Sequence, residues 1–441
     1  MLRRPSPRSA LRALALGLIV AAAVAGTLRA AQRPPVASFA APPDTTSTSA
    51  QPHFVTRFVS STQGVQTHSA SLVELRDGRV RAFWFEGSRE GAGDVVIRTA
   101  VFDPVTSRWG NAQVAVTRKQ TQHGLLRSVR KLGNPVPARQ ADGTLWLFYV
   151  TVSVGGWAGS SITAVRSTDE GANWSAPRRL ITSPFLNVST LVRGAPVLLA
   201  DHTLVLPVYH EFLGKFGELL RIGVDGTVID KQRLSDGRDG LQPILLVQSP
   251  ADALALMRWG GEAQPPRVIV TRTRDGGRTW STPAKTALAN PNSAVTGVVL
   301  PDGRMVVALN DVGGDRDQLS LIVSSNGGRD WRVAAVLEDQ LWFRDTPRGS
   351  ARYVERSRRL AADTDPERAG DGSAHAESAR RQMCVLRSPC AFEFSYPFLL
   401  ETSTGDIHVV YTWNRSFVKD VQFNSAWLDE RLKGADVAVH P

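Results

Sequence analysis

The octet Ser167–Trp174 (STDEGANW) recurs as Thr273–Trp280 (TRDGGRTW) and as Ser324–Trp331 (SSNGGRDW), and each copy has Asp or Asn five residues before the Trp. Asp or Asn followed by Gly favours a hairpin turn, because such turns need φ > 0 and a side chain that bonds its own backbone. The Trp is expected to anchor each turn against a sheet. Three copies at this regularity indicate a repeated β structure, and Phe102–Trp109 (FDPVTSRW) is a degenerate fourth copy.

A second repeat sets the number of units. Six segments have a turn that leads into an alternating strand: Glu74–Trp84, Arg139–Tyr149, Leu199–Tyr209, Gln248–Arg258, Leu300–Asn310 and Thr402–Thr412. Successive turns lie 50 to 65 residues apart, except for a last gap of 103. A unit of this length is typical of one four-stranded propeller blade. The repeats therefore predict an all-β, six-bladed β-propeller over residues 53–441, with a β-sandwich of recurring hairpins as the alternative.

The last gap holds a blade and an insertion at about 344–390. The insertion is rich in Arg and acidic residues and has one Tyr but no Phe or Trp after Arg344. Because this composition buries little apolar surface, we expect a mobile loop. The chain's two cysteines, Cys384 and Cys390, would close a small disulfide loop in an oxidising compartment. Two free thiols are the alternative, and two cysteines are too few for a structural zinc site.

The N-terminus is basic and then apolar. Six arginines lie in the first 33 residues, and Ala13–Leu28 is a run of sixteen largely apolar residues, short for a membrane span and typical of a signal peptide. Because Leu28-Arg29-Ala30 fits the small-x-small cleavage rule poorly, an uncleaved signal anchor over 1–30 is the alternative. Residues 31–52, rich in Pro, Ala, Ser and Thr, predict a flexible linker. In both cases the body of the protein is exported, and it meets a membrane only through this segment.

The charge does not indicate a nucleic-acid partner. The net charge of +11 falls to +5 without the six N-terminal arginines, and the remaining Lys and Arg are scattered among acidic residues. No zinc-finger or RNA-binding signature accompanies them. The sequence also lacks a metal-ligand cluster, a phosphate-binding loop and a nucleotide fingerprint, so we expect no cofactor and no metal.

Polar residues precede the inner strands of the predicted blades. In a propeller these strands line the central axis, and ligands bind where the strands begin. The polar positions are His68, Lys131 and Asn134, Asn187 and Arg193, Gln242, Asn290 and Asn292, and Glu393 and Tyr396. Buried polar groups need partners, so such a ring is either a hydrogen-bonded plug or a binding site. We expect these side chains to meet in one pocket.

At these positions the chain resembles the sialidase superfamily, specifically the bacterial predicted-neuraminidase group with Asp-box repeats. The resemblance extends over roughly Phe54–Leu428. It implies three arginines that clamp a substrate carboxylate, an Asp that acts as acid and base, and a Tyr nucleophile activated by a Glu. Guanidinium groups bind carboxylates in a bidentate manner, and a neutral phenol is not repelled by a sugar's own carboxylate.

The resemblance assigns four residues directly. Arg258 (LALMRWGG) falls where the second clamp arginine is expected, and Arg316 (GGDRDQ) falls where the third is expected. Tyr396 (EFSYPFL) resembles the nucleophile segment. Glu90 (FEGSREGAG) lies about where the acid/base Asp is expected.

Two positions depart from the family pattern. His68 (THSASL) stands in place of the first clamp arginine, and Gln242 (LQPILL) stands in place of the activating glutamate. Since an amide does not usefully accept a proton, Tyr396 needs another base, for which Glu393 and Glu211 are the candidates.

We therefore expect an exported, sialidase-like glycoside hydrolase of the exo-α-sialidase type that acts on terminal acidic sugars of glycans. The candidate catalytic residues are Glu90, Tyr396, Glu393 and Glu211. The candidate substrate-binding residues are His68, Lys131, Asn134, Arg193, Gln242, Arg258, Asn292, Arg316 and Arg415. One alternative is a polysaccharide lyase on the same scaffold that uses His68, Tyr396 and Arg258, and another is a non-catalytic carbohydrate-binding propeller, which the two departures favour.

Overall fold

The computed structural model describes residues 7–31, 38–40, 51–183, 187–234, 237, 239–345, 349–385 and 389–434. The chain forms two compact units, Met1–Ala37 and Ser38–Pro441. The first unit contains α1 (Pro7–Ala31), in which Leu11–Leu28 is long and apolar enough to cross a membrane. The linker expected at 31–52 lies mostly outside the described residues. Ser38–Ala40 belong to the second unit, where Phe39 is buried and forms a β-bridge with Leu199.

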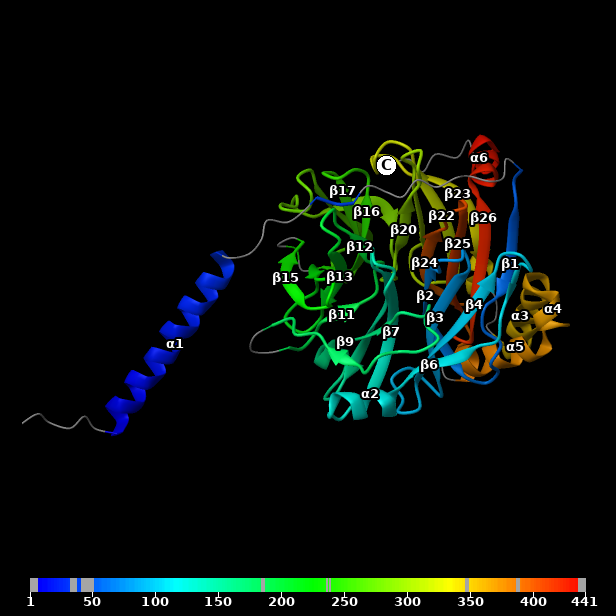
Figure 1. Ribbon diagram of the computed structural model, residues 1–441. Coiled ribbons are helices and arrows are strands. Elements are labelled where there is room, and N and C mark those ends of the chain that lie inside the picture. The colour runs from blue at the N-terminus through cyan, green and yellow to red at the C-terminus, as the bar shows by residue number, and fades with distance from the viewer. Residues whose placement is uncertain are drawn as a thin grey trace, which may run out of the picture. The chain divides into compact units, whose positions relative to one another are not determined.

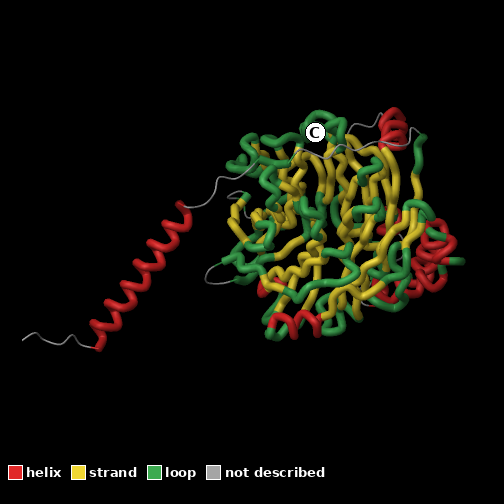
Figure 2. Tube along the Cα trace, in the orientation of Figure 1, coloured by secondary structure: helices red, strands yellow, loops and turns green. Residues whose placement is uncertain are grey.

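The second unit is a six-bladed β-propeller, as the repeats predict. Its strands form six antiparallel sheets arranged around an axis (Figure 1). Strands make up most of this unit, and helices lie at its periphery (Figure 2). Apart from the outermost strand of the last blade, the strands of each blade follow one another in sequence from the inside outward, which is why local hairpin signals were enough to count the blades.

The strands of blades one to three have the following bounds. Blade one has β2 (Gln66–Glu74), β3 (Val80–Gly87), β4 (Val96–Asp103), β5 (Arg108–Trp109) and β6 (Gln113–Thr117). Blade two has β7 (Lys131–Arg139), β8 (Leu145–Val152), β9 (Ser160–Ser167) and β10 (Arg178–Arg179). Blade three has β11 (Leu191–Val192), β12 (Val197–Leu198), β13 (Leu204–His210), β14 (Phe216–Ile222) and β15 (Val228–Arg233).

Blades four to six complete the ring. Blade four has β16 (Gly240–Val247), β17 (Ala253–Trp259), β18 (Arg267–Thr273) and β19 (Ala284–Ala289). Blade five has β20 (Thr296–Val299), β21 (Met305–Leu309), β22 (Gln318–Ser324) and β23 (Arg332–Asp339). Blade six has β24 (Phe394–Glu401), β25 (Asp406–Trp413) and β26 (Phe417–Asn424), and its outermost strand is β1 (Phe54–Phe58) from the start of the unit. The pairing of β1 with β26, from Phe54↔Phe423 to Phe58↔Lys419, closes the ring.

The three octets form identical turns. In the first, Gly171 N–H donates to Ser167 Oγ (2.8 Å) and Asn173 N–H donates to Asp169 Oδ1 (2.9 Å). The second and third octets repeat both bonds at 2.9 Å. Hydrogen bonds from the Asn173 side chain, the Asn173 N–H and Ser167 Oγ lower the pKa of Asp169 to about 2, so its carboxylate is ionised at neutral pH. The predicted self-bonding turn chemistry is confirmed.

Each blade contains a left-handed residue at the start of its inner region. Their φ angles lie between 43° and 56°, and the residues are Ser69, Asn134, Ser189, Gln242, Asn292 and Tyr396. In blades one, two, four and six the strand register shifts at this point, which is a β-bulge. Bulges re-aim side chains beside functional sites. Four of the six left-handed residues, Asn134, Gln242, Asn292 and Tyr396, belong to one hydrogen-bond network at the axis.

The insertion at about 344–390 is not a mobile loop where it is described. It forms η2 (Leu341–Asp345), α3 (Ser350–Thr364), α4 (Pro366–Ala369), α5 (Ser373–Arg380) and the π-helix η3 (Arg381–Val385). The expectation was wrong because small alanines let α3 and α5 pack closely, with Ala361, Ala376 and Ala379 fully buried. Charged residues stabilise the exposed faces through local pairs such as Glu355–Arg359. The predicted disulfide Cys384–Cys390 is formed and joins the π-helix to the chain that enters β24.

His375 of α5 fixes the insertion to the propeller. Its ring lies 4.2 Å from the ring centroid of Phe417 and 4.7 Å from that of Phe58. It is 1% exposed, and neither ring nitrogen has a hydrogen-bond partner among the described residues. The imidazole is therefore held in an apolar sandwich that disfavours its charged form.

Acid is expected to destabilise this packing. Burial lowers the pKa of His375 from 6.5 to about 4, with Asp365 partly opposing the shift. Below pH 6.5 the unfolded chain binds a proton that the folded chain rejects, so stability falls between pH 6.5 and pH 4, by up to about 3 kcal/mol. Urea unfolding across this range should show a smaller loss for His375→Leu. The matched variant of an exposed histidine, His123→Leu, should keep the wild-type loss, and equal losses in both variants would contradict the assignment.

Candidate functional site

Tyr396 lies at the centre of the axial site. Gln242 Nε2 and Arg258 Nη1 each donate to the Tyr396 hydroxyl oxygen at 3.3 Å. Arg258 Nη1 also donates to Gln242 Oε1 at 3.2 Å. The phenol is thus held between an amide from blade four and a guanidinium from the same blade, although it belongs to blade six.

Asn292 holds two arginines beside this tyrosine. Its side-chain oxygen accepts from Arg258 Nε (2.7 Å), and its backbone oxygen accepts from Arg316 Nη2 (2.9 Å). The Arg316 guanidinium carbon lies 5.9 Å from the Tyr396 ring centroid. One left-handed residue therefore orients both guanidinium groups, in a form suited to an anion that bridges them.

A buried carboxylate balances part of this positive charge. Glu393 is fully buried and accepts from Arg415 Nε at 2.9 Å, while Arg316 Nη1 lies 3.5 Å from its other oxygen. Ser395 Oγ donates to that second oxygen at 2.7 Å. Burial alone would raise the pKa of Glu393, but Arg415 and Arg316 outweigh burial and hold the pKa far below its usual range. Glu393 is therefore a carboxylate that binds protons poorly.

The start of β2 positions Glu90 and Arg415. The Glu90 backbone N–H donates to Gln66 Oε1, and the Thr67 N–H donates to the Arg415 carbonyl at 2.9 Å. Arg415 Nη1 then lies 3.3 Å from Glu90 Oε2. Gln66 Nε2 in turn donates to Gln382 Oε1 of the π-helix at 3.5 Å. The helical insertion is thus linked to the candidate acid/base through Gln66.

His68 lies against the nucleophile candidate. Its ring centroid is 4.3 Å from that of Tyr396, and Nδ1 lies 2.9 Å from Thr412 Oγ1. Burial, together with nearby Arg415, holds the pKa of His68 well below 6.5, although Glu393 partly opposes this. His68 is therefore a neutral imidazole at physiological pH.

Arg193 lies beneath Tyr396 and not at the surface of the pocket. It is 3% exposed, and its Nη2 donates to the carbonyls of Tyr396 (2.7 Å) and Pro397 (2.8 Å). Its guanidinium carbon is 5.4 Å from the Tyr396 ring centroid. Burial lowers the pKa of Arg193 to about 10. Its contacts support the bulge that carries Tyr396.

Tyr209 was missing from the candidate residues. Its hydroxyl accepts from Gln242 Nε2 (3.3 Å) and from Asn134 Nδ2 (3.4 Å). Burial, with further contributions from Tyr396 and Glu211, raises the pKa of Tyr209 strongly. Burial also raises the pKa of Glu211, against the effect of Arg258. The motif VYHE in β13 and the loop after it contains both residues, and the inward position of Tyr209 in this strand was the available signal.

The remaining polar positions lie around the site or serve their own loops. Lys131 Nζ is 5.5 Å from the Trp157 ring centroid and reaches the loop that contains Glu90, where it packs near Gly91. Asn187 bonds Leu180 and Thr182 of its own loop, and Asn290 Oδ1 accepts from Trp259 and Ser293 N–H groups. These two asparagines therefore have local turn roles. Among the described residues, no group of three His, Cys, Asp or Glu side chains could hold a metal ion.

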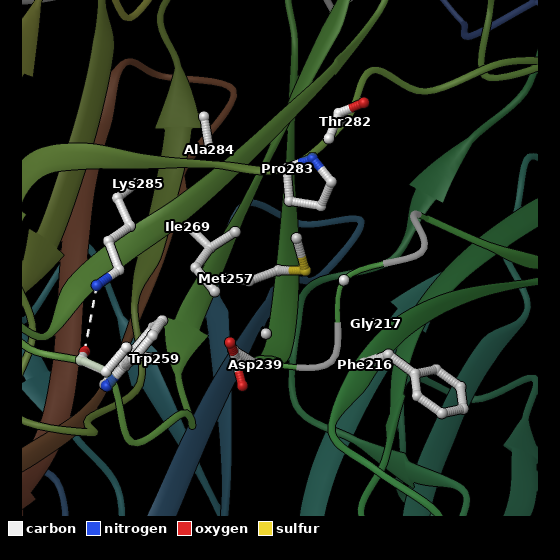
Figure 3. A pocket seen from close by; sticks show the side chains of 13 residues that line it. Phe216, Gly217, Asp239, Met257, Trp259, Ile269, Thr282, Pro283, Ala284 and Lys285 are labelled. Atoms are coloured by element: carbon white, nitrogen blue, oxygen red, sulfur yellow. Dashed lines mark hydrogen bonds between the residues drawn. The ribbon is translucent and has the colours of Figure 1, made fainter.

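A separate pocket of about 290 Å³ lies behind Arg258. Figure 3 shows Met257 and Trp259 lining it, with Lys285 over the indole at 4.4 Å. Side chains alternate along β17, so these residues point to the side of the sheet opposite Arg258. The pocket is largely apolar and is divided from the axial site by β16 and β17.

Loss of Arg415 is expected to leave the buried negative charge of Glu393 without a cation that balances it fully. Arg415→Met should destabilise the fold by about 3 kcal/mol in urea unfolding, because a buried charge loses its closest partner. Adding Glu393→Gln should recover about 1 kcal/mol or more of that loss relative to additivity. The control Arg359→Met breaks an exposed pair with Glu355 and should change stability by less than about 0.5 kcal/mol. Strict additivity of the two site variants would contradict the coupling.

Comparison with known proteins places this site in a family. The profile of the BNR repeat-like domain matches residues 78–409, which is 332 of the 441 residues. No curated protein matches the chain. The solved Hadza microbial sialidase Hz136 is similar at 14% identity and a TM-score of 0.59, with 82% of this chain and 66% of that one covered. The chain thus spans just under two thirds of that sialidase.

Two further solved structures share the fold over most of their own length. The intramolecular trans-sialidase from Ruminococcus gnavus is 12% identical, with a TM-score of 0.57 and coverage of 82% of this chain and 95% of that one. A protein of unknown function from Dyadobacter fermentans is 12% identical, with a TM-score of 0.57 and coverage of 84% and 98%. By its repeats, its propeller and the extent of the profile match, this chain belongs to the BNR repeat-like family.

Proposed function

We propose that this protein is an exported glycoside hydrolase of the sialidase type that acts on terminal acidic sugars of glycans. The observation that carries the proposal is the meeting of Tyr396 with Arg258 and Arg316 at the propeller axis. A sugar carboxylate bound across the two guanidinium groups would place its neighbouring anomeric carbon near the phenol oxygen. A tyrosine nucleophile avoids the repulsion that a carboxylate nucleophile would meet there.

Glu211 is proposed to be the base that takes the Tyr396 proton, while Gln242, which donates to the hydroxyl oxygens of both Tyr396 and Tyr209, holds the two phenols in place. Glu211 acts electrostatically on Tyr209 and Arg258. The raised pKa of Glu211 makes it a better proton acceptor than Glu393, whose pKa is held low. Glu393 instead holds Arg415 and Arg316 in place.

Glu90 and Arg415 are proposed to act at the leaving-group side of the bond that breaks. Glu90 is partly exposed at the mouth of the site and is the carboxylate nearest to the position of the family's acid/base. Its ion pair with Arg415 orients the carboxyl group before substrate binds. Arg415 also lies near His68 and therefore supplies a cation close to the position where the family's first clamp arginine is replaced.

Export is supported by two features of the chain. The helix α1 contains an apolar stretch near the N-terminus, typical of a signal sequence or an anchor. The disulfide Cys384–Cys390 fits an oxidising compartment. Both features suit a substrate outside the cytoplasm.

One contact favours a second candidate function, a polysaccharide lyase on the same scaffold. The tilted ring contact between His68 and Tyr396 places two proton-transfer groups side by side, beside the cation Arg258. An elimination at a uronic acid needs this combination of base, acid and cation. Absorbance of an unsaturated product near about 235 nm distinguishes elimination from hydrolysis. Saturable glycan binding without any product would instead support a binding protein.

Tyr396→Phe tests the nucleophile. Turnover of a fluorogenic sialoside should fall by about three orders of magnitude or more, because the covalent step loses its attacking oxygen. The melting temperature should change little. The matched variant Tyr149→Phe removes a buried hydroxyl that bonds Thr121 away from the axis, and it should retain turnover. Wild-type turnover in Tyr396→Phe would rule out the tyrosine mechanism.

Gln242→Glu tests the proton path. A carboxylate at this position would contact the phenol directly, so kcat on the sialoside should rise by about tenfold or more, with a new acidic limb in its pH profile. Gln242→Met, which is similar in size and has no acceptor, should lower kcat. A glutamate variant that folds normally and shows no increase would mean that phenol deprotonation does not limit the rate.

A further inference from the structure

The end of the propeller that holds the site also presents exposed apolar side chains. Leu126, Val154, Ile181, Phe212 and Leu213 lie in loops of blades two and three, at the end where the inner strands begin. Leu126 is 90% exposed and Leu213 is 70% exposed. Single exposed apolar residues are ordinary, but several around one opening indicate a contact surface. We call these five residues the apolar rim.

Hydrogen bonds within blade two and within blade three fix the loops of the apolar rim. Arg127 Nε, next to Leu126, donates to Ser153 Oγ beside Val154 at 2.9 Å. On the other side, the Glu211 N–H donates to Ser189 Oγ at 2.9 Å, which ties the loop containing Phe212 to blade three. Leu213 N–H donates to His210 Nε2 at 3.0 Å, and the His210 ring stacks on Phe216. The apolar side chains are therefore held in place while exposed.

Leu126 occupies a position where glycine is usual. It ends α2 (Arg118–Leu125) in the left-handed conformation, with φ of 48° and its N–H bonded to the last turn. A branched residue is disfavoured there, and Gly is the common choice at helix C-termini. The left-handed conformation strains the backbone at Leu126, and burial of the leucine side chain within the fold does not offset this strain. This favours an external contact for its side chain.

The blade-two part of this surface is strongly basic. Residues 118–131 (RKQTQHGLLRSVRK) contain five Lys or Arg and no acidic residue. Residues 178–183 add Arg178 and Arg179, again without an acid, and residues 153–160 carry no charge. Lys119, Arg127 and Arg130 are exposed. Cations interspersed with exposed apolar residues match an anionic lipid headgroup layer over an acyl layer.

We propose that the apolar rim and its basic residues bind the surface of an anionic phospholipid bilayer. The axial pocket then opens toward the membrane, and the glycans it receives are those presented at that surface. This goes beyond the proposed hydrolase function, because the contact requires no particular reaction. It also differs from insertion of α1, because a different part of the chain meets the lipid.

Two labelled variants of the full-length chain test the orientation. Ser128 lies beside the rim, and Ser107 lies in the turn after β4 at the opposite end of the propeller; both are exposed. Each is replaced by cysteine and labelled with an environment-sensitive nitrobenzoxadiazole dye, since the two native cysteines are paired. Phosphatidylglycerol vesicles should raise the emission of the label at position 128 about twofold or more, with a blue shift. The label at position 107 should not respond, although both proteins contain the same α1.

Further variants in the Ser128→Cys background separate the contributions. Phe212→Ser with Leu213→Ser, or Arg127→Glu with Arg130→Glu, should each reduce the emission change at least threefold. Leu126→Gly should reduce it while raising the melting temperature, because glycine relieves the left-handed strain. Pure phosphatidylcholine vesicles should give a smaller response. Equal responses at positions 128 and 107, or none at 128, would overturn the proposal, and neither result bears on sialoside turnover.

Discussion

Six backbone residues in the left-handed conformation, one in each blade, determine where the polar side chains of the candidate site lie. In a regular strand, side chains alternate between the two neighbouring blades. A left-handed residue at the start of the inner region, with a bulge in blades one, two, four and six, interrupts this alternation. Three of these residues, Asn134, Gln242 and Tyr396, are followed by proline, which has no N–H to leave unpaired where the ladder is interrupted. The same local backbone feature, repeated in each blade, thus brings together side chains that are hundreds of residues apart in the sequence.

The charges at the axis divide into two layers. In the deeper layer, Arg415 is neutralised by its ion pair with Glu393. Arg193, beneath Tyr396, donates its hydrogen bonds to backbone carbonyls. The upper layer, Arg258 and Arg316, is oriented by the neutral Asn292, and Arg316 also pairs with Glu393. Guanidinium groups keep their charge across the physiological range, whereas His68 stays neutral there. The upper layer of the axial site is therefore positively charged without protonation of His68.

The fold could be predicted from the sequence because its signals are local. A turn such as Ser167–Trp174 makes its own bonds wherever it occurs, so counting turns counts blades. The site could be predicted only as a set of residues. The sequence does not show whether Arg193 faces a ligand or a backbone carbonyl. It also does not show which carboxylate can accept a proton. Both depend on how loops from different blades contact one another. The insertion was misjudged because its aromatic content was low, whereas close packing between alanines supplied the buried contacts.

The closure of blade six has a consequence for how the protein is made. β1 emerges from the ribosome before every other strand of the propeller, yet its partner β26 is the last of these strands to be synthesised. Until then the ring has an open seam, and non-local pairing of this kind forms slowly. If the chain crosses a membrane during synthesis, β1 stays unpaired until β26 has also crossed. The propeller would then close only on the far side of the membrane.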